Sequence, residues 1–166
     1  MKLDVYYVDA FTSEMFSGNP AAVIFSELND EALMQQIAAE NNLSETAFVN
    51  LENNSIRWFS PVCEVNLCGH ATLASAYVFF NFLNNDVESI ALTSASGELK
   101  VYKQENFLQL DFPKDNFQFP TSLQSKGQSS LLFEALKPCP IYLPLWLHSE
   151  DILLHLYLWN VSKHSI

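Results

Sequence analysis

The sequence predicts an α+β fold in which a curved, mixed or antiparallel sheet wraps around one buried central helix. The first observation is a series of short segments rich in Val, Ile, Tyr and Phe, separated by turn signals, through the first 118 residues. The second is the segment His70–Leu83, whose Ala content and length favour a helix. This helix is apolar almost all round, so it must be buried on nearly every side. Its fourteen residues are too few to cross a bilayer.

The strands are predicted where β-branched and aromatic residues lie between Gly, Asn or Pro. They are expected at Leu3–Val8, Ala21–Phe25, Thr46–Leu51, Ser55–Phe59, Glu64–Leu67, Ser89–Ser94, Glu98–Lys103 and Phe107–Phe112. A further helix begins after Asn29 or Asp30, either of which can cap it, and runs to about Asn41. Its apolar face consists of Leu33, Met34, Ile37 and Ala38.

Composition excludes several classes of protein. The chain has 166 residues, of which 49% are hydrophobic, so it can bury a core and does not resemble a disordered acidic chain. Its net charge of −11 argues against nucleic acid or an anionic membrane as a partner. The N-terminus does not read as a secretory signal, and no apolar run is long enough for a membrane helix, so we expect a cytoplasmic protein. Three cysteines without zinc-type spacing predict neither a disulfide framework nor a metal site.

The composition changes near residue 118. All of the net negative charge lies before this point, whereas four of the seven prolines and three of the four histidines lie after it. We therefore expect one lobe at residues 1–118 and a divergent tail at residues 119–166. Within the tail, Ile152–Val161 is apolar and is a candidate for a helix or strand that packs on the lobe.

The start of the predicted buried helix, Cys68-Gly69-His70-Ala71-Thr72, is the first candidate site. A helix N-terminus presents unpaired N–H groups that suit a carboxylate or phosphate. The same position can lower the pKa of Cys68, and His70 can exchange a proton near neutral pH. The alternative, which the residues alone favour, is that Cys68 is a small buried residue and His70 a capping or core group.

The segment Asn42–Phe48 is the second candidate. Glu45 lies at the entrance to a strand beside apolar residues, where partial burial would raise the pKa of its carboxyl group and suit it to general acid–base catalysis. The alternative is an exposed glutamate in a turn. The turn at residues 17–20 is the third candidate, because Asn19 can hydrogen-bond a ligand there; taken alone it is only a tight turn.

Together these segments resemble the phenazine-biosynthesis PhzF-like family, a branch of the diaminopimelate epimerase-like fold. The matching stretches are Asp9-Ala10-Phe11-Thr12, Ser17-Gly18-Asn19-Pro20-Ala21-Ala22-Val23, Ser44-Glu45-Thr46-Ala47-Phe48-Val49, Ile56-Arg57-Trp58-Phe59-Ser60-Pro61 and Glu64-Val65-Asn66-Leu67-Cys68-Gly69-His70-Ala71-Thr72-Leu73-Ala74. They cover roughly residues 1–118 and occur in the family's order, which makes the resemblance specific.

The resemblance implies a two-lobed fold in which each lobe wraps a sheet round a central helix, with the active site between the lobes. It implies an isomerase or epimerase that moves a proton at carbon, without a cofactor, on a small carboxylate-bearing substrate. Glu45 would be the acid–base carboxylate, facing Cys68 and His70 across the pocket. The implied substrate-binding residues are Asn19, Ser44, Gly69 and Ala71.

The sequence departs from the family after Gln118, where no motif of the second lobe follows. We therefore expect a frameshifted or truncated second lobe and a chain with weak or no isomerase activity. The alternative is an inactive remnant or a small binding protein. A second copy of the chain, in a homodimer, is one way to cover the exposed face of the lobe.

Overall fold

The computed structural model describes residues 2–12, 17–105, 107–112, 154–156 and 161–165. Within these ranges lie ten strands, two α-helices and one turn of π-helix. In chain order they are β1 (Asp4–Ala10), β2 (Asn19–Phe25), α1 (Glu31–Asn41), β3 (Glu45–Asn50), β4 (Ser55–Phe59), β5 (Glu64–Val65), α2 (Gly69–Val78), η1 (Phe79–Leu83), β6 (Ser89–Ser94), β7 (Gly97–Lys103), β8 (Leu108–Asp111), β9 (Leu154–Leu156) and β10 (Val161–Ser165).

The strands form one mixed sheet. Its order is β10-β1-β2-β3-β4-β6-β7-β8-β9, and β5 pairs with β4 alone. Most neighbours are antiparallel, but β2 and β3 are parallel, as are β4 and β6. Parallel neighbours need a crossover connection. The connection from β2 to β3 contains α1, and that from β4 to β6 contains α2. The predicted α+β class with a mixed sheet is therefore confirmed.

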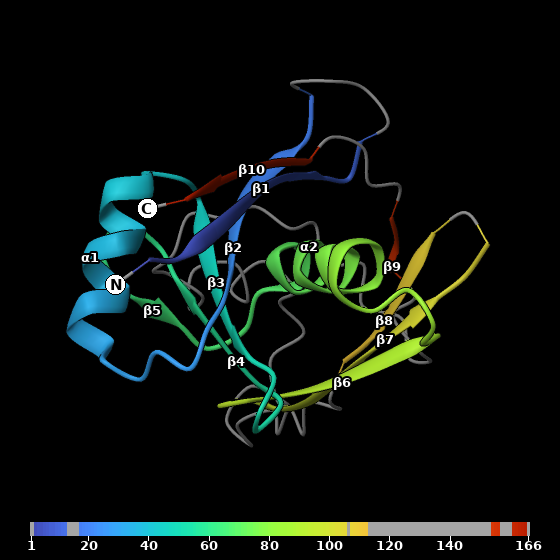
Figure 1. The fold of residues 1–166 in the computed structure, drawn as a ribbon. Helices are drawn as coiled ribbons and strands as arrows, with labels where there is room; N and C mark the ends of the chain where they lie inside the picture. Colours follow the sequence, from blue (N-terminus) through green and yellow to red (C-terminus); the bar gives the residue numbers. More distant parts are fainter. Residues whose placement is uncertain (1, 13–16, 106, 113–153, 157–160, 166) are drawn as a thin grey trace, which may run out of the picture. The chain divides into compact units, whose positions relative to one another are not determined.

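Helix α2 is the centre around which the sheet curves (Figure 1). It contacts β1, β2 and β3 on one side and β8 on the other. The main core lies between this helix and the inner face of the sheet. Its buried members are Tyr6, Val8, Ala10, Ala21, Val23, Ala47, Val49, Ile56, Trp58, Cys68, Ala71, Leu73, Ala74, Ala76, Val78, Phe80, Ile90, Leu92, Leu99, Val101, Leu108 and Leu110. The sheet and the helix are held together by this cluster, as predicted.

The prediction that His70–Leu83 is a helix buried on nearly every side is confirmed for most residues up to Phe80 and wrong at its last turn. Residues 70–76, Val78 and Phe80 are buried, but Phe82 is 53% exposed and Leu83 is 44% exposed. The backbone widens into the π-helical turn η1 here. The turn reaches the surface, where the Phe82 ring lies 5.6 Å from the ring of Tyr6.

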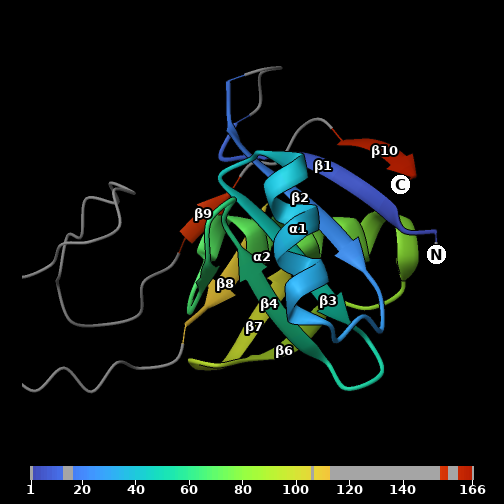
Figure 2. The same cartoon turned by 90° about the vertical axis from the view of Figure 1, so that its left-hand side faces the viewer.

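Helix α1 packs on the opposite face of the sheet from α2 (Figure 2). Asp30 caps it, since its Oδ1 accepts a hydrogen bond from the backbone N–H of Leu33 at 3.2 Å. The smaller core beneath it contains Leu3, Val5, Ala22, Ile24, Met34, Ala38, Phe48 and Phe59. Helix α1 therefore matches the sequence prediction, including one of the two expected caps.

Two strands of the sheet come from the predicted tail. Strand β9 pairs with β8, and β10 pairs with β1, so they lie at the two ends of the sheet. The described residues of this tail, 154–156 and 161–165, belong to the same compact unit as the described residues before it. The boundary expected at residue 118 lies outside the described residues and stays a prediction.

Candidate active site

Glu45 is the first residue of β3, and its side chain is only 1% exposed. The alternation of a strand explains its direction. Ala47 and Val49 belong to the core around α2, whereas Phe48 belongs to the core beneath α1. Glu45 shares the face of Ala47 and Val49, so its carboxyl group points towards α2. It is thus a buried acidic group, not the exposed turn residue of the alternative interpretation.

Cys68 and His70 come from the N-terminal end of α2. Cys68 occupies the N-cap position with extended backbone, and its side chain makes no capping hydrogen bond. Its thiol lies 3.3 Å from Nδ1 of His70. Thr72 Oγ1 donates to the Cys68 carbonyl at 2.6 Å, which helps fix this first turn. Both Cys68 and His70 are 7% exposed.

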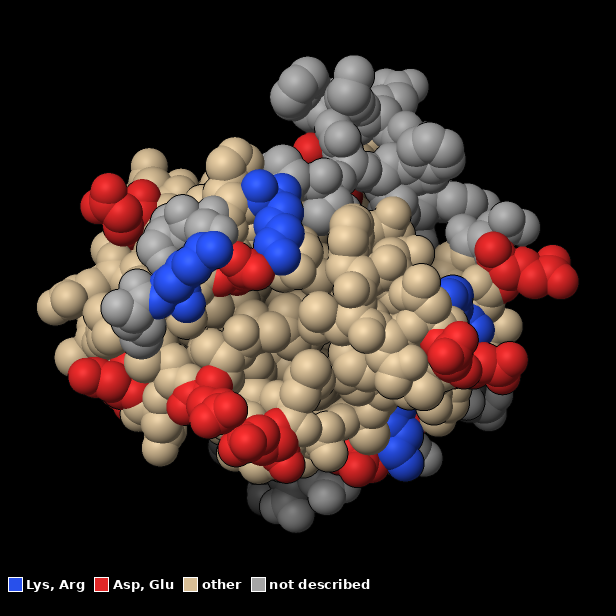
Figure 3. All heavy atoms as spheres, viewed as in Figure 1, with Lys and Arg blue, Asp and Glu red and all other residues tan. Residues whose placement is uncertain are grey.

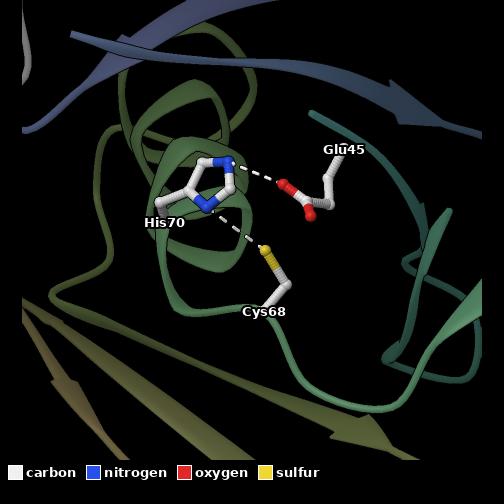
Figure 4. Close-up of side chains that lie close together, drawn as sticks. All are labelled: Glu45, Cys68 and His70. Carbon is white, nitrogen blue, oxygen red and sulfur yellow. Dashed lines mark hydrogen bonds and ion pairs between the residues drawn. The ribbon is translucent and has the colours of Figure 1, made fainter. Parts of the chain in front are cut away.

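The three predicted catalytic side chains meet at one point (Figure 4). Nε2 of His70 lies 3.2 Å from Oε2 of Glu45, while its Nδ1 faces the Cys68 thiol. The imidazole therefore stands between the carboxyl group and the thiol. The Glu45–His70 pair lacks the alignment of a hydrogen bond, and neither Oε2 nor Nε2 has a hydrogen-bond partner among the described residues. Buried polar atoms in proteins are usually paired, so these two are exceptional.

Burial sets the protonation of all three groups. It raises the pKa of Glu45 above its usual value, although a hydrogen bond from Ser44 opposes the change. It lowers the pKa of His70 to about 4, so the imidazole is neutral at pH 7. Burial, with the nearby charge of Glu45, raises the pKa of Cys68 to about 12. The prediction of a thiol with a lowered pKa is therefore wrong: the backbone N–H groups of His70 and Ala71 favour the thiolate, but burial outweighs them.

The predicted binding residues Asn19 and Ser44 lie beside Glu45. Strands β2 and β3 pair so that Ala21 stands opposite Glu45. The Ser44 hydroxyl lies 3.1 Å from Asn19 Oδ1 and 3.0 Å from the Pro20 carbonyl, with both oxygens placed to accept its proton. These bonds join the ends of the two strands at the site, while the ligand-binding role of both residues stays a prediction.

The other two predicted binding residues, Gly69 and Ala71, lie in the first turn of α2. Gly69 is partly exposed, whereas Ala71 is fully buried. Any contact that Ala71 makes with a ligand must therefore come through its backbone. Their binding role also stays a prediction.

Phe11, in the stretch Asp9-Ala10-Phe11-Thr12, is a neighbour of the site for which the sequence predicts no role. Its ring lies 6.2 Å from the ring of His70, and its side chain is 41% exposed. Its φ of 68° is in the left-handed region, which is uncommon for a bulky residue. Such strain often occurs at functional positions. The sequence contains no signal for this conformation, because the residue is neither Gly nor Asn.

The comparisons with known proteins agree with this fold. The family model described as "Phenazine biosynthesis-like protein" (PhzC-PhzF) matches residues 8–138, and the chain belongs to this family. An uncharacterized isomerase of Pseudomonas aeruginosa is 50% identical over 129 residues, which is 75% of this chain and 48% of that protein. The human phenazine biosynthesis-like domain-containing protein is 46% identical over 124 residues, or 68% of this chain and 43% of that protein.

Solved structures show the same relationship. The crystal structure of a PhzF-family protein from Enterococcus faecalis has a TM-score of 0.64 and 48% identity, and the match covers 75% of this chain and 50% of that one. A predicted epimerase from Pseudomonas aeruginosa shares the fold at 22% identity, with a TM-score of 0.55; the match covers 66% of this chain and 42% of that one. This chain spans about half the length of the relatives it matches.

Among the described residues, none of the helices has the length and apolar character needed to cross a membrane.

Proposed function

We propose that this chain carries one half of an isomerase site that moves a proton at carbon, without a cofactor, on a small carboxylate-bearing substrate. The observation that carries the proposal is the buried Glu45 carboxyl group with an unpartnered oxygen beside a neutral imidazole. Membership of a family in which several relatives are named isomerases supports the reaction class.

Glu45 is the proposed acid–base group. A carboxyl group whose pKa is raised towards neutrality removes and returns protons more effectively than an exposed one. As a carboxylate, it would take a proton from the substrate carbon; as the resulting acid, it would return a proton to another position after partial exchange with solvent. Protons balance among the substrate, Glu45 and solvent, so no cofactor is required.

His70 and Cys68 are proposed to hold Glu45 and the substrate in position. A thiol with a pKa of about 12 is protonated at neutral pH and suits a donor to His70 Nδ1. The single N–H proton of the neutral imidazole is then on Nε2, which faces Glu45. The high pKa makes Cys68 unsuited to act as a thiolate base.

The first turn of α2 is the proposed binding site for the substrate carboxylate. The N-cap side chain leaves backbone N–H groups without a capping partner, and the helix dipole favours negative charge there. The same N–H groups can stabilise the negative charge that develops when a proton leaves an adjacent carbon.

Solvent-deuterium exchange followed by NMR tests this proposal. Purified chain would be incubated in deuterium oxide with a panel of amino acids and cyclic unsaturated amino acids. We expect slow incorporation at a carbon next to the carboxylate. Glu45→Gln should reduce it about 10²- to 10⁴-fold, because the general base is lost. Glu52→Gln, in the exposed β3–β4 turn, is the matched control and should leave the rate unchanged. Equal rates in the wild type and Glu45→Gln would refute the role of Glu45.

A second candidate function, a binding protein without catalysis, is favoured by how closed the site is. Its three side chains are at most 7% exposed. Saturable binding of one of these carboxylates, with no exchange in the wild type, would support this alternative.

We also propose that a second copy of the chain covers the face around the site in a homodimer. Phe11 is 41% exposed beside His70, and Leu67, the neighbour of Cys68, is 44% exposed. Apolar side chains that flank a buried polar cluster in this way suit a protein contact.

A further inference from the structure

We propose that Phe11 is a positioning residue of the site, whose ring covers His70 and keeps water away from the contact between the imidazole and Glu45. The centroid of the Phe11 ring lies 6.2 Å from that of His70, and the two ring planes are tilted by 45°. This distance is within the range at which aromatic rings pack against one another. The role belongs to the proposed isomerase site and rests on that proposed function, but its test has a readout that needs no catalysis.

The exposure of Phe11 differs from that of its surroundings. Phe11 is 41% exposed, whereas His70 is 7% exposed and Glu45 only 1%. Its neighbours in the chain, Ala10 and Thr12, are both buried. One part of the Phe11 ring therefore lies against the imidazole while another part reaches the surface, as a cover does and a core residue does not.

The backbone of Phe11 is held in a conformation that a bulky residue rarely adopts. Its φ of 68° is left-handed, and such a conformation persists only where the surrounding structure imposes it. Gly18 provides part of that surrounding structure. A Cβ at position 18 would lie 2.5 Å from the Ala10 carbonyl oxygen and 2.7 Å from Cγ2 of Thr12. Only glycine allows this close approach, so the residues on both sides of Phe11 pack against Gly18.

The same region of the chain connects Phe11 to Glu45. Strands β1 and β2 pair so that Ala10 stands opposite Asn19. Oδ1 of Asn19 lies 3.1 Å from the hydroxyl of Ser44, the residue that precedes Glu45. The backbone that holds the Phe11 ring is therefore joined to the end of the strand that carries the carboxyl group.

Exclusion of water decides the state of His70. Among the described residues, the imidazole faces two ionisable groups, the Glu45 carboxyl group at 3.2 Å and the Cys68 thiol at 3.3 Å. Burial lowers the pKa of His70 to about 4. Water beside the ring would stabilise the imidazolium ion and weaken the electrostatic interactions within the site. Without its cover, His70 would titrate nearer to 6.5 and would no longer be a neutral partner for Glu45.

NMR titration of the full chain tests the proposal. The His70 signals would be assigned by comparison with His70→Gln and followed downwards from about pH 8 for as long as circular dichroism shows a folded chain. We expect the pKa to rise from about 4 towards 6.5 in Phe11→Ser. Phe11→Leu keeps an apolar cover and should retain most of the low value. Gly18→Ala keeps the ring but displaces the backbone that holds it, so it should also raise the pKa.

Leu67→Ser is the matched control. Leu67 is another exposed apolar residue beside the site, 44% exposed, and its substitution leaves the Phe11 ring in place, so the pKa of His70 should not change. An unchanged His70 pKa in folded Phe11→Ser would overturn the proposal. An equal rise in Leu67→Ser would overturn it too, because the loss of a contact between copies would then explain both results.

The deuterium-exchange reaction provides the second readout. Phe11→Ser should lower kcat at least ~10-fold and change KM less than ~3-fold, because the cover acts on the reacting groups more than on binding. A raised His70 pKa with an unchanged kcat would overturn the positioning role. If the wild type catalyses no exchange, the proposed function fails, whereas the titration of His70 still decides whether Phe11 covers the imidazole.

Discussion

The protonation of Cys68 is decided by competition between its position on the helix and its burial. A helix N-terminus stabilises a thiolate, typically by no more than ~2 kcal/mol. Removing the thiolate from water costs more, and the neighbouring Glu45 adds repulsion, so the pKa rises to about 12. Sequence reveals the helix start but not how completely the sheet closes over it. The helix start therefore predicts a lowered pKa for Cys68, whereas burial raises that pKa.

The cysteines should therefore differ in reactivity. Cys63 is exposed, whereas Cys68 is buried with a raised pKa. We expect an alkylating reagent such as N-ethylmaleimide to modify Cys63 at least ~100-fold faster than Cys68 in the folded chain near neutral pH, because the thiolate is the nucleophile. Peptide mass spectrometry over a time course measures both rates. Unfolding in urea is the control and should make them similar; similar rates in the folded chain would contradict the prediction.

His70 should make the fold sensitive to acid. Its pKa is about 4 in the folded chain, against 6.5 for an unburied histidine, so the unfolded state takes up the proton first as the pH falls. The stabilising contribution is complete above pH 6.5 and is lost as the pH falls towards 4. The difference amounts to about 3 kcal/mol.

Urea denaturation of the wild type and His70→Gln at about pH 7.5 and about pH 4.5 measures this effect. The wild type should lose about 3 kcal/mol more than the variant between the two values. The raised pKa of Glu45 acts in the opposite direction, but that carboxyl group is present in both proteins. Equal losses in the two proteins would show that His70 takes up its proton normally in the fold.

Helix α2 is buried over most of its length. Leu73 is fully buried against the sheet, while Leu83 in the following turn is 44% exposed. Leu73→Ala should lower the free energy of unfolding by about 2–5 kcal/mol, since it leaves a cavity in the main core. Leu83→Ala removes the same atoms near the surface and should cost less than ~1.5 kcal/mol. Chemical denaturation compares the two, and equal costs would argue against α2 as the centre of the core.

A helix or strand could be predicted where the residues of one continuous segment determine it. The apolar face and Asp30 cap predicted α1, and alternating or β-branched residues located the strands. The pairing of strands depends on segments that are far apart in the sequence, and it could be predicted less well. Nothing local to Ala21 indicates that it stands opposite Glu45 in a parallel ladder. The meeting of Glu45 with His70 likewise depends on that ladder and on α2. The family resemblance predicts this meeting, whereas spacing along the sequence does not.

At the scale of the whole molecule, acidic side chains are spread over the viewed face and a broad uncharged area lies between them (Figure 3). We expect the chain to dimerise through the face around the site, and sedimentation velocity over a range of concentrations measures this. Phe11→Ser and Leu67→Ser should each weaken the dimer at least ~10-fold by removing buried apolar area.

Leu51→Ser is the matched control for this surface. Leu51 is 39% exposed but follows the far end of β3 from Glu45. It should leave the dimer unchanged. A dimer weakened equally by all three variants, or a wild type that sediments as a monomer at every concentration, would refute the proposed face.

The pairing of β1 with β10 has a consequence for how the chain folds during synthesis. Strand β1 precedes the other described strands in the chain, yet among the described residues one of its two edges is paired only by residues 161–165. The register sets Asp4 opposite Ser165, and an ion pair of 2.7 Å joins Asp4 and Lys163. Such a contact has the highest sequence separation the sheet contains, and closing it is entropically slow. Until those residues leave the ribosome, the nascent chain presents an open strand edge of the kind that recruits other chains. Chaperone capture of β1 should therefore end only when residues 161–165 become available.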